Sequence, residues 1–136
     1  MNKIGVVYAT KTKHSKKLAE AIGEALKVKA ENVLSNPALS DLDLLFIVGG
    51  LYGGESLPEL LGFVKDLDSS KTKSAALITS SASDKKGQDS IRKLLENKGI
   101  KVVDETRCYG SFLVMKIGHP NKADISHAVD FALQIS

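Results

Sequence analysis

The sequence predicts an α/β protein, a three-layer α/β/α sandwich around a five-stranded parallel sheet. Short apolar runs alternate along the chain with longer segments of helical period, which is the pattern of repeated strand–helix units. The strongest run, residues 42–48, shows almost no polar alternation, as expected for a central strand buried on both faces. The length of 136 residues and the apolar content of 43% suit one globular unit, so we expect residues 1–136 to form a single domain.

The first half of the chain supplies three strands and one full helix. Residues 4–8 predict the first strand, and residues 28–34 predict a weak second strand near the edge of the sheet. Asn36-Pro37 ends this second run, and the few residues before the third strand at 42–48 leave room for a second helix that is short or absent. The first helix is predicted by apolar residues at a spacing of i, i+4, i+7 and i+8: Leu18, Ile22, Ala25 and Leu26.

The third strand is expected to end at Gly49-Gly50, and a helix follows it. Ser56 and Glu59 have the spacing of a capping box, and Pro58 lies where a first-turn proline is tolerated. Residues 75–78 then predict a fourth strand, which we expect the small polar residues after it to end.

The last part of the chain predicts a helix, a strand and a closing helix. A helix around residues 91–95 ends before Gly99, where a left-handed C-cap residue belongs. The fifth strand follows at residues 100–109. The final helix covers residues 125–132, and Asn121 is positioned to cap it.

Charge is distributed unevenly along the chain although the net charge is only +3. Residues 31–70 carry seven acidic residues and one lysine, whereas the segments on both sides are basic. A basic surface can bind nucleic acid, but the sequence has no Lys/Arg run with interleaved aromatics and no tryptophan. We therefore expect no nucleic-acid partner.

From the hydropathy of the sequence we expect no membrane span and no secretory signal. Its longest nearly uninterrupted apolar run, residues 42–51, is far below the roughly 20 residues that a transmembrane helix needs. The single cysteine, Cys108, cannot form an intramolecular disulfide and supplies no metal framework. These features predict a cytoplasmic location, and the sequence predicts neither a metal site nor catalytic residues.

Ligands of such sheets bind at the carboxyl ends of the strands, so the loops there are the candidate sites. Residues 9–15, after the first strand, combine hydroxyl groups, lysines and a histidine at a helix N-terminus, where free N–H groups favour an anion such as phosphate. The alternative is an ordinary polar turn with Ser15 as its N-cap.

Two further loops could contact a flat ligand. Residues 49–54 contain four glycines, which allow a close approach of the backbone, and Tyr52 offers an aromatic face. Residues 79–83 carry small hydroxyl groups that could bind a polar ring edge. Glycine turns and Ser/Thr turns without any ligand remain the alternatives for both loops.

Three related phosphate or nucleotide folds do not fit. The Gly-Lys-Ser/Thr of a Walker loop is absent, and so is a Gly-x-Gly-x-x-Gly fingerprint after the first strand. A response-regulator receiver needs an acidic residue at the end of the third strand, where this chain has Val48-Gly49-Gly50.

Taken together, the segment Lys3 to Thr12 and the helix beginning near Ser15 resemble the start of flavodoxins, and the resemblance extends over the whole chain in length and in the order of its elements. The stretches 108–112 and 118–124 resemble a subgroup of short flavodoxin-like proteins. The resemblance implies the strand order 2-1-3-4-5 and noncovalent binding of FMN. It also implies a phosphate loop after the first strand, with loops after the third and fourth strands on either side of the flavin.

Carried over to this chain, the resemblance places the phosphate at Thr10, Thr12 and Ser15 and a flavin-stacking aromatic at Tyr52. The full set of residues that we predict to bind the cofactor is Thr10, Lys11, Thr12, Lys13, His14, Ser15, Gly50, Leu51, Tyr52, Gly53, Gly54, Thr79, Ser80, Ser81 and Ala82.

The predicted function is electron transfer between redox partner proteins, a reductase and an acceptor, by a monomer or weak dimer. One alternative is an enzyme on the same fold, an FMN-dependent reductase of a quinone or other small acceptor. Another is an interaction module that has lost FMN, because Lys13-His14 replaces the usual Gly-Asn pair of the phosphate loop.

Overall fold

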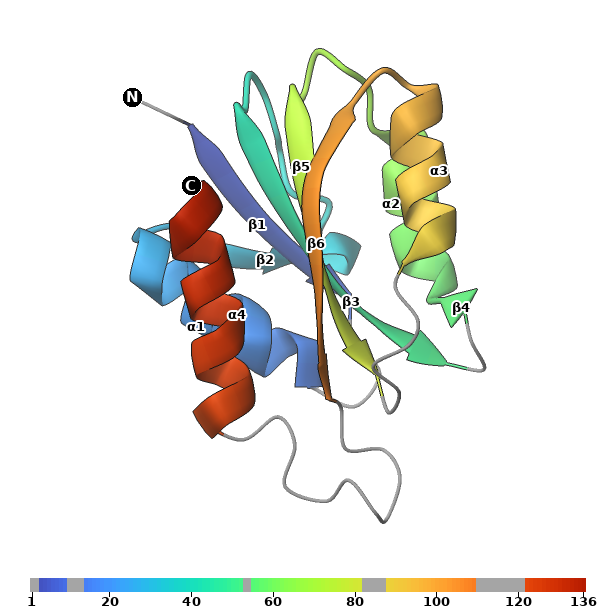
Figure 1. Ribbon diagram of the computed structural model, residues 1–136. Helices are drawn as coiled ribbons and strands as arrows, with labels where there is room; N and C mark the ends of the chain where they lie inside the picture. The colour runs from blue at the N-terminus through green and yellow to red at the C-terminus, as the bar shows by residue number, and fades with distance from the viewer. Residues whose placement is uncertain (1–2, 10–13, 53–54, 82–87, 110–121) are drawn as a thin grey trace.

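The computed structural model describes residues 3–9, 14–52, 55–81, 88–109 and 122–136, and its centre is a parallel sheet (Figure 1). The sheet order is β2-β1-β3-β5-β6, which confirms the predicted order of five parallel strands. The structure adds one short strand, β4, which pairs antiparallel with the end of β3. The strands are β1 (Ile4–Ala9), β2 (Ala30–Asn32), β3 (Leu44–Tyr52), β4 (Glu55–Ser56), β5 (Ser74–Ser81) and β6 (Lys101–Tyr109).

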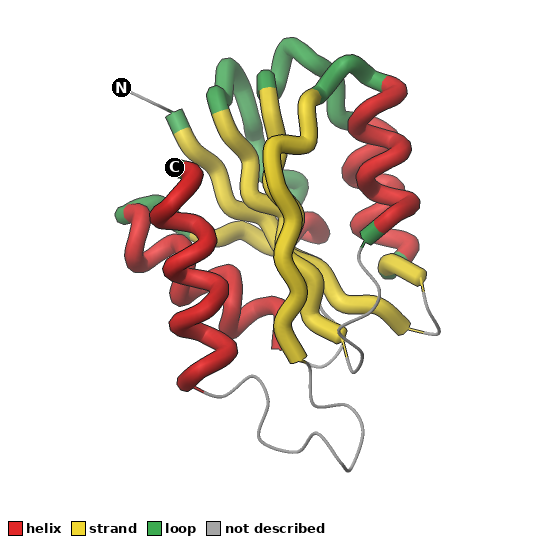
Figure 2. Tube along the Cα trace, viewed as in Figure 1, coloured by secondary structure: helices red, strands yellow, loops and turns green. Residues whose placement is uncertain are grey.

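Helices cover both faces of the sheet, which confirms the three-layer sandwich (Figure 2). Two of them, α1 (His14–Leu26) and α4 (Lys122–Ile135), lie together on one face. The other two, α2 (Pro58–Asp66) and α3 (Asp89–Asn97), lie on the opposite face (Figure 1). Right-handed crossovers between parallel strands produce this distribution.

The connection from β2 to β3 lacks an α-helix. Residues 33–43 are all described and contain a single 3₁₀ turn, η1 (Val33–Ser35), followed by irregular chain. The side chain of Asn32 caps η1 by accepting a hydrogen bond from Leu34 N at 2.9 Å, and Asn36 ends it with φ of +50°. The prediction of a short or absent second helix is therefore confirmed.

Strand β3 is the centre of the core and is buried on both faces. Its odd-numbered residues Leu45 and Ile47 pack toward α2 and α3, whereas the even-numbered Phe46 and Val48 pack toward α1 and α4. All four side chains are fully buried. This two-sided burial explains why the strand has no polar alternation.

Three predicted boundaries were wrong. Strand β3 does not end at Gly49-Gly50 but continues to Tyr52, and β5 continues through the hydroxyl residues to Ser81. Helix α2 has no capping box, because Ser56 is paired in β4 and Leu57 is the N-cap residue. Pro58 does occupy the first turn of the helix, as predicted.

The end of α3 follows the prediction, and the last strand contains one irregularity. Gly99 has φ of +78°, the left-handed conformation expected after a helix C-cap. Beyond it, the register of β6 against β5 shifts by one residue between Ala75 and Ala76, so Val103 is an extra residue, as in a β-bulge. The predicted cap of the last helix, Asn121, lies outside the described residues.

Within the described part of the chain, no helix is both long enough and apolar enough to cross a bilayer.

The position of Phe46 gives a first prediction. Its side chain is fully buried against the α1 and α4 layer, so Phe46→Ala should lower the free energy of unfolding by about 3–5 kcal/mol through lost burial and a new cavity. Urea denaturation measures this change. The control Leu133→Ala removes a half-exposed side chain and should change stability by less than about 0.5 kcal/mol. Equal losses in the two variants would contradict the two-sided core.

Asp43 gives a prediction about pH. The main-chain N–H of Lys3 donates to its carboxylate at 2.8 Å and, with Lys73 Nζ at 3.5 Å, lowers the pKa of Asp43 below its usual value. Because the folded protein holds the ionised form, this stabilisation is present above about pH 4 and is lost as the pH falls through the lowered pKa.

The variant Asp43→Asn should therefore be less stable than wild type at pH 7, and the difference should shrink toward pH 3. Urea midpoints measured across this range test the prediction, with Glu96→Gln on the exposed side of α3 as the control. A difference that stays constant with pH would contradict it.

Candidate functional site

The carboxyl ends of β1, β3 and β5 meet at one edge of the sheet. Ala9 is the register partner of Gly49, and Gly49 is in turn the partner of Thr79. One step further along, Gly50 is paired with Ser80. Helix α1 follows β1 and begins at His14. This edge, which we call the carboxyl edge, is where parallel sheets bind ligands.

The structure brings the described members of the predicted site to the carboxyl edge. His14 and Ser15 open α1; Gly50, Leu51 and Tyr52 end β3; Thr79, Ser80 and Ser81 end β5. The strand segments were predicted as loops, and this was wrong because their backbones complete the ladders between the strands. The other predicted residues lie outside the described part: Thr10, Lys11, Thr12, Lys13, Gly53, Gly54 and Ala82.

Three buried hydroxyl groups near this edge have no hydrogen-bond partner among the described residues: Ser15 Oγ, Ser56 Oγ and Thr79 Oγ1. Two of them, Ser15 and Thr79, belong to the predicted site and are fully buried. An unsatisfied buried hydroxyl costs roughly 1–3 kcal/mol, so natural proteins rarely keep one without a reason. Both groups are available to bind a ligand at the carboxyl edge.

The start of α1 adds a positive field beside Ser15. The first N–H groups of a helix have no partner within the helix, and its dipole places partial positive charge there. The first turn of α1 contains no acidic residue, and Lys16 and Lys17 follow Ser15 directly. The arrangement suits an anionic group such as a phosphate.

Gly49 is explained by close packing. A Cβ atom at this position would lie 2.7 Å from Leu60 Cδ2 of α2 and 2.8 Å from Gln88 Oε1. Both distances are too short for real Cβ contacts. The glycine therefore allows α2 and the start of α3 to approach the carboxyl edge of the sheet.

Gln88 is a buried polar residue that the sequence reasoning missed. Its Nε2 donates to Ile78 O at 3.0 Å and, at 3.5 Å, to Ile47 O, which joins the neighbouring strands β5 and β3. Its Oε1 has no partner among the described residues, although the side chain is fully buried. No local motif marks a glutamine for this role, because the role depends on contacts between distant segments.

Two carboxylates fix the beginning of α3 beside the site. Glu105 of β6 accepts hydrogen bonds from Arg92 Nη2 at 2.8 Å and from the main-chain N–H of Gln88 at 2.9 Å. The hydrogen bond to the Glu105 carboxylate raises the pKa of the Arg92 guanidinium. Glu55 of β4 accepts from Ser90 Oγ at 3.0 Å. These bonds tie the first turn of α3, and with it Gln88, to the two strands β6 and β4.

Potential metal ligands and histidines were the other candidates for a site in the described part of the chain. No group of three or more potential metal ligands occurs among the described residues. His127 Nε2 lies 2.7 Å from Thr106 Oγ1, so this histidine links α4 to β6. It is therefore a structural residue.

Comparison with known proteins identifies the family. Residues 5–128 match the flavodoxin domain, and the chain therefore belongs to the flavodoxin domain family. The fold described above is that of this class. A search of curated proteins by sequence found no match.

Solved structures show the same fold at low sequence identity. A short-chain flavodoxin associated with a non-canonical PDU bacterial microcompartment is similar with a TM-score of 0.70 and 17% identity over 98% of this chain and 95% of that one. Oxidised flavodoxin 2 from Bacillus cereus has a TM-score of 0.71 and 16% identity over 96% and 95%. A flavoprotein in complex with FMN from Lactobacillus acidophilus has a TM-score of 0.59 and 14% identity over 79% and 93%.

The residues present fit FMN, the cofactor of this family. Ser15 offers an unpaired hydroxyl at a helix N-terminus, as a phosphate requires. Thr79 offers a second hydroxyl at the end of β5, as a polar ring edge requires. The donor set at the carboxyl edge is thus suited to both ends of the cofactor.

Gly49 gives the prediction for this site. Gly49→Ala should lower the free energy of unfolding by about 1–3 kcal/mol, because the added methyl group collides with Leu60 and Gln88. Thermal and urea denaturation measure the change.

The matched control is Gly62→Ala in α2, where an added Cβ meets no atom within 4 Å. It should raise stability by up to about 1 kcal/mol, since alanine is the better helix former. A Gly49→Ala variant as stable as wild type would contradict the close approach of α2.

Proposed function

We propose that this protein binds FMN at the carboxyl edge of its sheet and carries electrons between a reductase and an acceptor protein. The observation that supports this most is the pair of buried, unpaired hydroxyls at Ser15 and Thr79. Both have a use when a ligand occupies the edge, and each is a net cost when the edge is empty. Membership of the flavodoxin domain family makes FMN the ligand to test first.

In this proposal the loop after β1 and the start of α1 hold the phosphate. Ser15 donates its hydroxyl to a phosphate oxygen, and the free N–H groups of α1 add further donors. Thr10 and Thr12 contribute hydroxyls, while Lys11, Lys13 and His14 complete this part of the site. The cationic side chains make charge-assisted contacts that compensate for the missing Gly-Asn pair.

The proposal places the flavin ring between the ends of β3 and β5. Gly50 to Gly54 form one side, with Tyr52 stacking on the ring and Leu51 supporting the backbone from the core. The segment from Thr79 to Ala82 forms the other side, where Thr79 hydrogen-bonds a polar ring edge. Gln88 holds the carbonyls of Ile47 and Ile78 and so keeps these two sides at a constant separation.

FMN supplies the redox chemistry when it is bound, so the chain needs no acid–base pair and no nucleophile of its own. The residues of the chain bind the phosphate, orient the ring and exclude water from one face. We further propose that the protein acts as a single domain in the cytoplasm, as a monomer or weak dimer. Its lone cysteine is compatible with a reducing compartment.

The test is FMN titration of wild-type, Ser15→Ala and Thr79→Val protein, followed by quenching of flavin fluorescence. Loss of a hydrogen bond to a charged phosphate is worth about 1.5–3 kcal/mol, so Ser15→Ala should raise the Kd by roughly 10- to 150-fold. Thr79→Val removes a neutral hydrogen bond and should raise it by about two- to tenfold. The variant Ser69→Ala alters an exposed serine on a distant turn and is the control.

The same variants should not destabilise the FMN-free protein, because the deleted hydroxyls have no partner among the described residues. Denaturation without FMN checks this. Lost stability with unchanged FMN affinity would assign the two hydroxyls a structural role. A folded wild-type protein that binds no FMN would contradict the proposal and favour an interaction module.

A further inference from the structure

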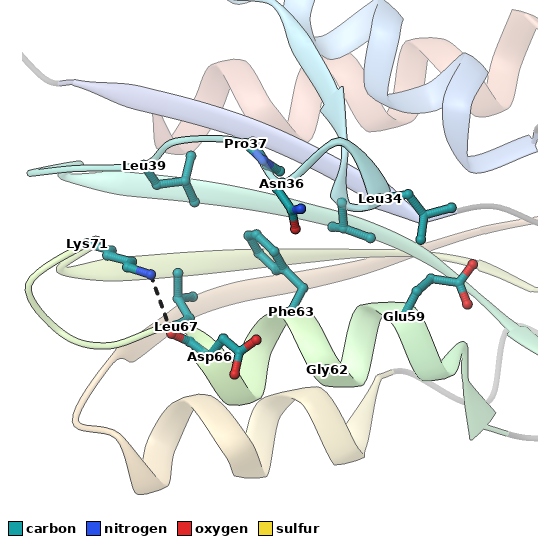
Figure 3. A pocket seen from close by; sticks show the side chains of 11 residues that line it. Leu34, Asn36, Pro37, Leu39, Glu59, Gly62, Phe63, Asp66, Leu67 and Lys71 are labelled. Carbon is teal, nitrogen blue, oxygen red and sulfur yellow. Dashed lines mark hydrogen bonds between the residues drawn. The ribbon is translucent and has the colours of Figure 1, made fainter.

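A groove lies on the opposite side of α2 from α3, between α2 and the chain that connects β2 to β3 (Figure 3). Its volume is about 490 Å³, and its apolar lining includes Leu34, Pro37, Leu39 and Phe63. A right-handed β2–β3 crossover normally places a helix on this face, but here the crossover contains only η1 and irregular chain. The groove thus occupies the position of a helix that this chain lacks.

We propose that this groove, which we call the α2 groove, docks an amphipathic helix of a partner protein. In this complex the apolar face of the partner helix packs on Phe63 and Leu34. Its basic side chains lie near Glu59 and Asp66, at the two ends of the groove. This is the helix-in-groove mode of recognition. The inference is independent of the proposed cofactor, because Ser15 and Thr79 do not line the α2 groove.

The groove-facing side of α2 has the spacing of a helix-packing surface. Glu59, Gly62, Phe63 and Asp66 follow one another at i, i+3, i+4 and i+7, and all four line the groove. They form one stripe along the helix, with an aromatic ring and a glycine at its centre and a carboxylate at each end (Figure 3). The two acidic residues are about 10 Å apart along the axis.

Nothing in the described part of the structure requires a glycine at position 62. A glycine inside a helix is less favourable than alanine by about 1 kcal/mol. A Cβ at Gly62 would meet no atom within 4 Å, and Gly62 does not have positive φ. Neither packing nor backbone conformation therefore requires it. A missing side chain at the middle of the stripe does allow the backbone of a second helix to approach closely.

The charge of the groove favours a basic partner, because its lining contains two carboxylates, Glu59 and Asp66, and one cation, Lys71. No ion pair of Glu59 or Asp66 occurs among the described residues, and Lys71 Nζ donates instead to the main-chain oxygen of Asp66 at 3.4 Å (Figure 3). Both carboxylates are available to cations of a partner. Leu34, which also lines the groove, is 67% exposed and adds apolar surface for a partner to cover.

The probe for this proposal is a synthetic helical peptide of leucine and lysine, about sixteen residues long, with leucines at i, i+3, i+4 and i+7. The chain has no tryptophan, so one tryptophan in the peptide reports binding without background. The peptide should bind saturably, and amide signals that shift in ¹⁵N–¹H spectra should belong to α2, η1 and residues 36–41.

Two changes should weaken binding by at least about tenfold. Gly62→Gln fills the centre of the groove, and the double variant Glu59→Lys/Asp66→Lys reverses its charge. The matched control is Glu96→Lys/Asp130→Lys, which changes the net charge equally at exposed positions outside the groove and should keep full affinity. Gly62→Gln should also melt at or above the wild-type temperature, so its loss of binding cannot result from unfolding.

Several outcomes would overturn the proposal. Equal losses in the two charge-reversal variants would indicate nonspecific attraction, and shifted amides outside the groove would place binding elsewhere. Equally tight binding of octyltrimethylammonium would replace the helix with a small organic cation. Self-association of wild-type protein that Gly62→Gln abolishes and the peptide does not displace would identify the occupant as a second copy. No saturable binding of the peptide would also exclude the α2 groove as a helix site.

Discussion

The two-sided burial of β3 is the constraint on which the rest of the structure depends. Leu45, Phe46, Ile47 and Val48 fill both helical layers at once, so the strand can be neither shifted by one residue nor moved to an edge without exposing part of the core. Its central place brings β1 to one side and β5 to the other. The ends of these three strands then necessarily meet at the carboxyl edge.

Beyond Val48, strand β3 no longer packs large side chains on both faces and instead lets other side chains approach its backbone. Gly49 leaves space for Leu60 and Gln88, and these side chains connect the edge to α2 and α3. The bonds of Glu105 to Arg92 and Gln88 then tie α3 to β6. The candidate site is thus supported on the α2 and α3 face by a continuous set of packed and hydrogen-bonded groups, while Ser15 Oγ and Thr79 Oγ1 make no hydrogen bond to the described residues. Rigid support of this kind reduces the ordering that a ligand must bring about.

The burial pattern of the sequence predicted the layers, and the resemblance to flavodoxins implied the strand order, which the structure confirms. Residues 42–48 form an almost uninterrupted apolar run, which is the pattern of a strand buried on both faces. The short β2–β3 connection was predicted from the small number of residues between the two strands. Ends of elements were harder to predict. The glycines after Val48 look like a turn in sequence, yet Gly49 pairs with both β1 and β5 and Gly50 pairs with β5. Glycine also occurs in strands where a neighbour packs closely. Ser56 has capping-box spacing, but it lies in β4 and pairs with Leu51 of β3, so it does not cap α2. No sequence pattern predicted the buried, bridging role of Gln88, because its partners Ile47 and Ile78 are distant in sequence.

The irregular edge strand β6 has a consequence for how the protein behaves at high concentration. An outer strand of nine residues exposes unpaired backbone groups that could join the edge of another molecule. The bulge at Val103 breaks the regular spacing of those groups, and the charged residues Asp104 and Glu105 follow it directly. At the other edge, β2 is only three residues long. Both edges are therefore poor templates for intermolecular sheet growth, which lowers the tendency of the folded protein to aggregate at high concentration.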